Sequence, residues 1–228
     1  RDRVIVFDGA FGTFVQDLDL GPADFGGDSL EGCNEMLCLT RPDVIESMHR
    51  AFLDVGVDVI ETASFGSFST VLVEYNIPEK AYELNVAAAA IARRVADTYE
   101  VDSRPRYVAG SIGPGTKLPS LGHIDFATLR DSYEEQARGL LDGGSDLFLI
   151  ETCMDLLQIK AAMQACRRAM KSVGREVPIQ VQVTMETTGR MLVGTEIGAA
   201  YASLQAMKPD VIGINCATGP SEMQEHLR

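Results

Sequence analysis

Several features that would point directly to a class of protein are absent from this 228-residue sequence. No apolar run approaches the roughly 18 residues that a membrane-spanning helix needs, so no membrane partner is predicted. The glycine-rich segment at 8–13, DGAFGT, lacks both the GxGxxG pattern and the Gly-Lys-Ser/Thr ending of phosphate-binding loops. No two of the five cysteines form a Cys-x-x-Cys pair, which argues against a structural zinc site.

Positive charge is also scarce. The sequence has 20 Lys and Arg against 33 Asp and Glu, a net charge of −13. An acidic chain repels phosphate backbones, and the nearest basic groups, at 93–94 and 167–168, lie on predicted amphipathic helices where a solvated face explains them. We therefore predict no nucleic-acid partner.

The scattered cysteines are odd in number and form no disulfide framework, so we expect reduced thiols and a cytoplasmic protein. The sequence opens on a strand-like segment at 4–7, without the cationic and apolar regions of a signal peptide. Because it does not begin with Met, this second observation carries little weight.

A recurring unit organises the chain: an amphipathic helix, a break, an aspartate, an apolar strand and a polar pair. It is clearest at 56–62 (GVDVIET) and 144–152 (GSDLFLIET), and looser at 208–216 (KPDVIGINC). Hydrophobic periodicity predicts the remaining elements. Further strands are expected at 4–7, 107–114 and 178–185, and helices at about 40–55, 81–99, 125–142, 156–172 and 197–206.

This β-α alternation, repeated about six times, predicts a parallel sheet covered by helices. An open doubly wound sheet and a (β/α)₈ barrel both fit. Polar residues follow nearly every strand, whereas a doubly wound sheet concentrates its ligands at one switch point, so the pattern favours the TIM-barrel family. We expect residues 1–228 to form one barrel domain, incomplete at its C-terminal end because eight units are needed.

Two strand ends carry candidate functional groups. Cys216 follows an apolar run in an Asn-Cys pair, so it is either a small core residue or a thiol at the edge where such folds do their chemistry. Asp8 follows the first strand and either faces a substrate or closes a turn. Cys33 and Cys38 lack the spacing of metal ligands and are not predicted to bind a metal. Residues expected to pack or lie at the surface, rather than act, are His49, His123 and Cys153.

Six ordered blocks closely resemble the homocysteine-binding barrel of cobalamin-dependent methionine synthase, from one end of the chain to the other. They are DGAFGT at 8–13, GCNEMLCLTRPDVI at 32–45, VDVIETASF at 57–65, GSIGPGTK at 110–117, LIETCMDLLQIKAA at 149–162 and IGINCATGP at 212–220. The resemblance implies a homocysteine S-methyltransferase that forms methionine. The methyl group would come from methylcobalamin on another domain of a longer chain, which would also have folate and activation domains.

The resemblance also implies a zinc ion held by three cysteines. The Asn-Cys pair of the family matches Cys216, whereas the adjacent Cys-Cys pair is absent, so two further ligands are expected beyond Arg228. Zinc with three protein ligands leaves a position for the homocysteine sulfur, which ionises on coordination. We expect this chain alone to bind zinc weakly and to lack transfer activity.

The family's substrate-binding positions can be carried over residue by residue. Glu151 and Asp8 match those that bind the ammonium group, and the backbone of Gly9 and Ala10 suits the carboxylate. Asn215 is expected either beside the metal ligands or as a substitute zinc ligand. Glu61 ends an equivalent strand and is expected to form structural hydrogen bonds with neighbouring loops, with a place beside the metal ligands as the alternative.

Three other functions are alternatives to this one, and two of them remain open. The same barrel occurs in homocysteine methyltransferases that use betaine or S-methylmethionine. A phosphate-binding barrel isomerase or aldolase would need a phosphate cradle and a Schiff-base lysine at a strand end, and neither is present. The chain could also act only as an assembly module. Six strands leave bare sheet edges, so a second copy or another chain is expected to cover them.

Overall fold

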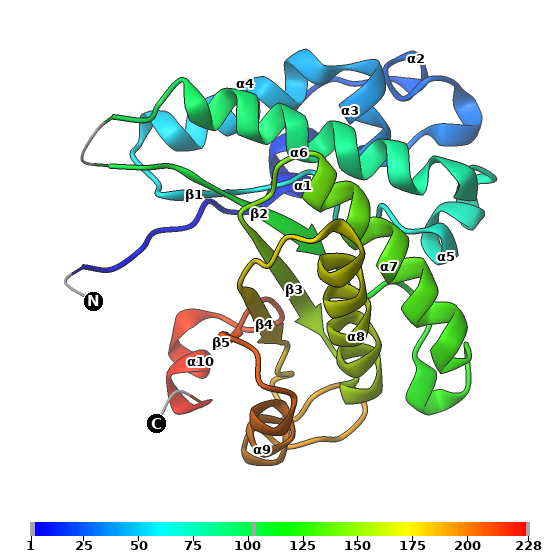
Figure 1. Ribbon diagram of the computed structural model, residues 1–228, viewed down its shortest axis with the longest axis vertical. Helices are drawn as coiled ribbons and strands as arrows, with labels where there is room; N and C mark the ends of the chain where they lie inside the picture. The colour runs from blue at the N-terminus through cyan, green and yellow to red at the C-terminus, as the bar shows by residue number, and fades with distance from the viewer. Residues whose placement is uncertain (1–2, 102–103, 227–228) are drawn as a thin grey trace.

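The structure is a computed structural model that describes residues 3–101 and 104–226. Its centre is a parallel sheet whose strands follow one another in chain order (Figure 1). The strands are β1 (Val59–Glu61), β2 (Tyr107–Ile112), β3 (Leu147–Cys153), β4 (Ile179–Val183) and β5 (Val211–Ile214). A doubly wound sheet would reverse this order at its switch point, so the winding is that of a barrel.

Helices connect successive strands and follow the sheet around one side (Figure 1). The long ones are α4 (Pro42–Asp54), α6 (Ala81–Asp97), α7 (Phe126–Asp142), α8 (Leu156–Val173) and α9 (Ile197–Met207), each within two residues of its predicted bounds. The short ones are α1 (Phe11–Gln16), α2 (Pro22–Phe25), α3 (Leu37–Thr40), α5 (Ser69–Leu72) and α10 (Pro220–His226). Single 3₁₀ turns are η1 (Asp28–Leu30), η2 (Asn34–Met36), η3 (Val73–Tyr75), η4 (Pro78–Lys80) and η5 (Pro119–Leu121). Within the described ranges no helix is long and apolar enough to cross a bilayer.

The first predicted strand, at 4–7, is shorter than expected. Only Phe7 pairs with the sheet, through a parallel bridge to Val59, and the side chain of Val4 is 80% exposed. Among the described residues, no strand pairs with the edge of this segment that faces away from β1. The segment therefore lacks a second neighbour that would hold it in a longer ladder. The bridge still extends the strand order by one position, as a barrel requires.

The repeated aspartate before each strand has a structural task. In all three repeats the aspartate N–H donates to the backbone carbonyl of one residue in the preceding strand or strand-like segment. The aspartate carboxylate accepts the N–H of that same residue. The pairs are Asp58–Val6 (2.8 and 3.0 Å), Asp146–Val108 (2.8 and 2.8 Å) and Asp210–Ile179 (2.8 and 2.8 Å). These reciprocal bonds fix the register at the end of the sheet opposite the polar pairs.

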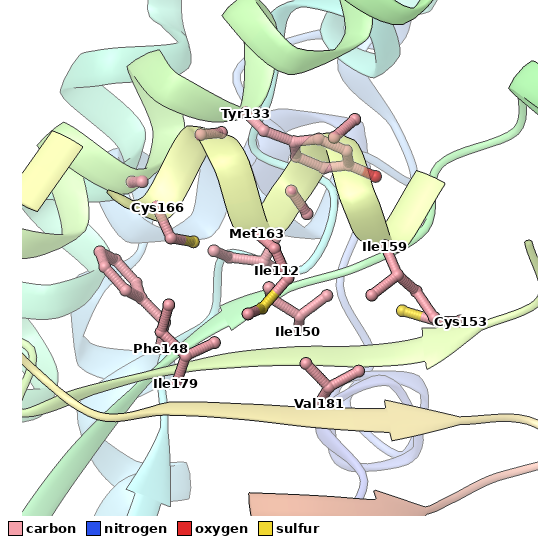
Figure 2. Packing of buried hydrophobic residues seen from close by; sticks show 14 of the residues in the cluster. Ile112, Tyr133, Phe148, Ile150, Cys153, Ile159, Met163, Cys166, Ile179 and Val181 are labelled. Atoms are coloured by element: carbon pink, nitrogen blue, oxygen red, sulfur yellow. The ribbon is translucent and has the colours of Figure 1, made fainter. Parts of the chain in front are cut away.

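The main core lies between the sheet and the helices, and Figure 2 shows part of it between β3, β4 and α8. Along β4 the sequence IQVQV alternates, with its isoleucine and valines buried against the helices. Cys153 and Cys166 belong to this core and are fully buried, which confirms the packing role predicted for Cys153. A smaller apolar cluster fills the opposite, inner face of the sheet.

Candidate active site at the carboxyl ends of the strands

The inner face of the sheet changes from apolar to polar toward the carboxyl ends of the strands. At its centre Val59, Ala109 and Leu149 are buried together. Successive side chains on a strand alternate between faces, so residues two positions further along point to the same side. On β1, β2 and β3 these are Glu61, Ser111 and Glu151. The site therefore begins one layer above the apolar floor of the barrel interior.

Glu151 is 8% exposed, and both oxygens of its carboxylate are bound. The Ser111 hydroxyl donates to Oε1 at 2.6 Å, and the side-chain amide of Asn215 donates to Oε2 at 3.3 Å. Burial raises the pKa of Glu151, and the bond from Ser111 opposes that shift by stabilising the charged form. The carboxylate is thus held in one orientation at the carboxyl ends of the strands, which are called the mouth of the barrel below.

Asp8 is tied to the end of β1, and does not close a turn of its own. Both of its carboxylate oxygens accept the backbone N–H of Glu61, at 3.1 and 3.0 Å. Burial raises the pKa of Asp8 to about 7, the bond from Glu61 limits the shift, and the charge of Glu151 adds to it. Asp8 is therefore brought near the candidate ammonium-binding carboxylate.

The Glu61 carboxylate forms no hydrogen bond or ion pair with any residue in the described ranges, so the structural bonds expected of it are not found there. Its pKa is raised to about 9, first by burial and then by the charges of Glu151 and Asp8. Three acids that oppose each other's ionisation share this mouth. Such an arrangement favours a cationic ligand, because a cation relieves the repulsion.

Asn215 links the two sides of the mouth. Its Oδ1 accepts the backbone N–H of Thr152 at 2.9 Å, and its Nδ2 donates to the hydroxyl of the same residue at 2.9 Å. Its backbone carbonyl accepts the Thr184 hydroxyl at 3.0 Å. Together with the bond to Glu151, these contacts hold the end of β5 against the ends of β3 and β4.

Cys216 is the one exposed thiol among the five cysteines, and it does not pack into the core. Its backbone is left-handed (φ 59°), as is that of Ala217 (φ 58°), so the chain turns sharply at the end of β5. The sulfur lies 3.4 Å from Asn215 Nδ2 and 3.6 Å from Thr152 Oγ1. Within residues 3–101 and 104–226 no group of three His, Cys, Asp or Glu side chains converges to hold a metal, so Cys216 supplies a single thiol.

The backbone of Gly9 and Ala10 lies exposed between Asp8 and α1. In the part of the chain that the structure describes, neither N–H has a hydrogen-bond partner outside a helix. These two donors follow directly after the Asp8 carboxylate. Both N–H groups can therefore donate hydrogen bonds to an anionic group, next to the carboxylates that would bind a cation.

The other candidates lie away from this mouth or serve packing. Cys33 and Cys38 are buried in the core. His49 is fully buried on α4, and neither ring nitrogen has a hydrogen-bond partner among the residues that the structure describes; burial lowers its pKa to about 4. His123 is exposed, and its Nδ1 accepts the Leu118 N–H at 3.3 Å.

Sequence reasoning missed two residues of the site, Ser111 and Thr152. The only signals were a hydroxyl inside an otherwise apolar strand and the second member of the repeated Glu-Thr pair. Neither signal states which side chain the hydroxyl will contact, because the contacts cross from one strand end to the next.

The sequence matches the family described as Homocysteine S-methyltransferase over residues 5–228. It is 54% identical over 226 residues to the methionine synthases of Mycobacterium leprae (strain TN) and Mycobacterium tuberculosis (strain ATCC 25618 / H37Rv), covering 99% of this chain and 19% of each relative. The homocysteine methyltransferase MmuM from Escherichia coli, in its metallated form, has the same fold, with a TM-score of 0.78 at 22% identity over 99% of this chain and 80% of that one. Its apo form gives a TM-score of 0.70 at 21% identity, over 98% and 77%. Since the family match extends over nearly the whole sequence, the chain belongs to the homocysteine S-methyltransferase family.

Proposed function

We propose that this chain binds homocysteine at the mouth described above and presents its sulfur for methylation, as the homocysteine-binding barrel of a methionine synthase. One observation carries the proposal. The Asn215 side chain bridges a buried carboxylate, Glu151, and an exposed thiol, Cys216, with bonds of 3.3 and 3.4 Å. The mouth therefore joins a group suited to an ammonium with a group suited to a metal.

The amino-acid end of homocysteine has a natural orientation in this mouth. Its ammonium would lie against Glu151 and Asp8, replacing the repulsion between them by attraction to a cation. Its carboxylate would accept the backbone N–H groups of Gly9 and Ala10. Holding both ends of the amino acid points the side chain, and so the sulfur, toward the remaining part of the mouth.

Cys216 would supply one thiolate ligand of a zinc site. The residues present fit one ligand: the sulfur is exposed and lies beside an amide N–H and a hydroxyl, the kind of donors that orient metal ligands. The proposed zinc site needs two further cysteine ligands, which would come from outside residues 1–228. When bound, zinc lowers the pKa of the homocysteine thiol and so favours the nucleophilic thiolate.

The methyl donor lies outside this chain. The relatives named methionine synthase are about five times longer, since the chain spans 19% of their length. We propose that cobalamin carries the methyl group on another domain, alongside folate and activation domains. A single barrel domain over 1–228, a second copy or chain covering the open sheet edges, and a cytoplasmic location all stay predictions; the ends of the proposed domain, 1–2 and 227–228, lie outside the described residues.

Methionine formation tests the proposal. The full-length protein is incubated with homocysteine and one donor at a time: methyltetrahydrofolate with cobalamin, S-methylmethionine, or betaine. We expect methionine only with the first, and none from the Cys216→Ser variant. Methionine from betaine or S-methylmethionine would support the alternative members of the family, and no methionine from any donor would refute the proposal.

A further inference from the structure

Thr152 follows Glu151 and contacts both Asn215 and Cys216. We propose that Thr152 is a positioning residue for the metal-binding sulfur. Its backbone N–H and hydroxyl fix the Asn215 amide, so that one amide N–H and one O–H are directed at Cys216. The inference rests on the proposed function, because it concerns the sulfur that would bind zinc.

The backbone around Thr152 is unusual for a strand. Its φ is 56°, in the left-handed region, although threonine is β-branched. The register between β3 and β4 shifts between Ile150 and Cys153, which is the signature of a bulge. Bulges turn a side chain out of the regular alternation. Here the bulge brings both the N–H and the hydroxyl of Thr152 to the Asn215 side chain.

The Thr152 N–H decides which way the Asn215 amide is oriented. An N–H can donate to the amide oxygen but not to the amide nitrogen, so the 2.9 Å contact fixes Oδ1 on this side. Nδ2 must then lie on the other side, where its two hydrogens are shared among Thr152 Oγ1 at 2.9 Å, Glu151 Oε2 at 3.3 Å and the Cys216 sulfur at 3.4 Å. Without the Thr152 contacts, the flipped amide would present its oxygen to the sulfur.

The hydroxyl of Thr152 supplies a second donor. Because Oγ1 accepts a hydrogen bond from Asn215, its own proton is free for another acceptor, and the Cys216 sulfur lies 3.6 Å away. A sulfur that binds a metal accepts hydrogen bonds, so the Thr152 hydroxyl and the Asn215 amide are placed to donate to it and to orient it.

The other Glu-Thr pair provides a matched control. Thr62 ends the first repeat, is 3% exposed, and its Oγ1 accepts the Ser111 N–H at 2.9 Å and contacts Ser64 Oγ at 2.6 Å. It makes no contact with the Cys216 sulfur in the described structure. Removing its hydroxyl disturbs a hydrogen bond of the scaffold without touching the sulfur.

Zinc affinity of the full-length protein, measured by competition with a chelator, tests the proposal. Thr152→Val keeps the shape and the N–H but removes the hydroxyl, and Thr152→Ser keeps the hydroxyl. We expect Thr152→Val to weaken zinc binding by about 10- to 100-fold and Thr152→Ser to remain within about threefold of the wild type. Thr62→Val should lower the unfolding midpoint while zinc binding stays unchanged.

Other results would overturn the role of Thr152. Unchanged zinc binding in Thr152→Val would do so, and so would a loss in Thr152→Ser as large as that in Thr152→Val. An equal loss in Thr62→Val would show that general destabilisation is the cause. A wild-type protein that binds no zinc would refute the proposed metal site itself, and the role of Thr152 with it.

Discussion

Asp8 accepts the backbone N–H of Glu61 with both oxygens of its carboxylate, at 3.1 and 3.0 Å. This contact joins the segment before the sheet to the end of β1, and it brings two acids of the mouth together. The cost is electrostatic, because burial and the charge of Glu151 raise the pKa of both groups. The site is thus arranged for a cation at the expense of the stability of the fold.

Glu61→Gln should stabilise the protein at high pH. The folded-state pKa of Glu61, about 9, lies above its ordinary value of 4.5, so the folded state holds the proton more tightly and the wild type loses stability as pH rises through this range. The neutral amide avoids that loss. We expect the variant to gain on the order of 2 kcal/mol at pH 9 relative to pH 5, measured by urea unfolding. The exposed Glu31→Gln should show no such gain, and an equal gain there would contradict the account.

His49 should make the protein sensitive to acid. Its folded-state pKa of about 4 lies below the ordinary value of 6.5, so its stabilising contribution is present above pH 6.5 and is lost as pH falls toward 4. The loss should approach about 3 kcal/mol for a fully buried imidazole. Chemical denaturation between pH 7 and pH 4 should show a flatter profile for His49→Leu. The exposed His123→Gln should keep the wild-type profile, and a wild-type slope in His49→Leu would exclude His49 as the cause.

The aspartate repeat should be important for stability. Asp146→Ala removes the acceptor of the Val108 N–H and the ion pair with Arg93, both at 2.8 Å. We expect a loss of about 2 kcal/mol in the free energy of unfolding, with a smaller loss in Asp146→Asn, which retains an acceptor. Asp131 is exposed and, in the described structure, pairs with the half-buried Arg130 and the exposed Arg168, so Asp131→Ala should cost less than about 0.5 kcal/mol. Similar losses for Asp146→Ala and Asp131→Ala would remove the special role of the repeat.

Cys216 should react with thiol reagents before the other cysteines of residues 1–228. It is exposed, whereas Cys33, Cys38, Cys153 and Cys166 are buried. Alkylation of the metal-free native protein, followed by peptide mass spectrometry, should label Cys216 first. Unfolding should make all five equally reactive. Labelling of a buried cysteine as fast as Cys216 in the native protein would contradict this order of reactivity.

Much of the fold could be predicted from sequence periodicity. Strands buried on both faces and long amphipathic helices carry strong local signals, so α4 and α8 were predicted within two residues. The segment at 4–7 has the composition of a strand but pairs only at Phe7, because pairing depends on a neighbour and not on the segment itself. The segment at 19–40 contains short helices whose packing is not visible in local sequence patterns.

The candidate site was predicted less completely. Asp8, Glu151, Asn215 and Cys216 do come together, as parallel strand ends should. The left-handed backbone of Thr152 could not be predicted, since threonine disfavours it and only contacts from another strand maintain it. It was equally unpredictable that the Glu61 carboxylate has no hydrogen-bond partner among the described residues. The structural bond comes instead from the backbone N–H of Glu61.

We expect one mouth to bind the ammonium of homocysteine at Glu151 and its sulfur beside Cys216. Calorimetric binding of homocysteine and of methionine to the zinc-loaded full-length protein separates the two ends, because methionine has the ammonium but no free thiol. We predict that Glu151→Gln weakens both ligands by about tenfold or more, whereas Cys216→Ser weakens homocysteine alone. Equal weakening of both ligands by Cys216→Ser, or unchanged binding in Glu151→Gln, would contradict the account.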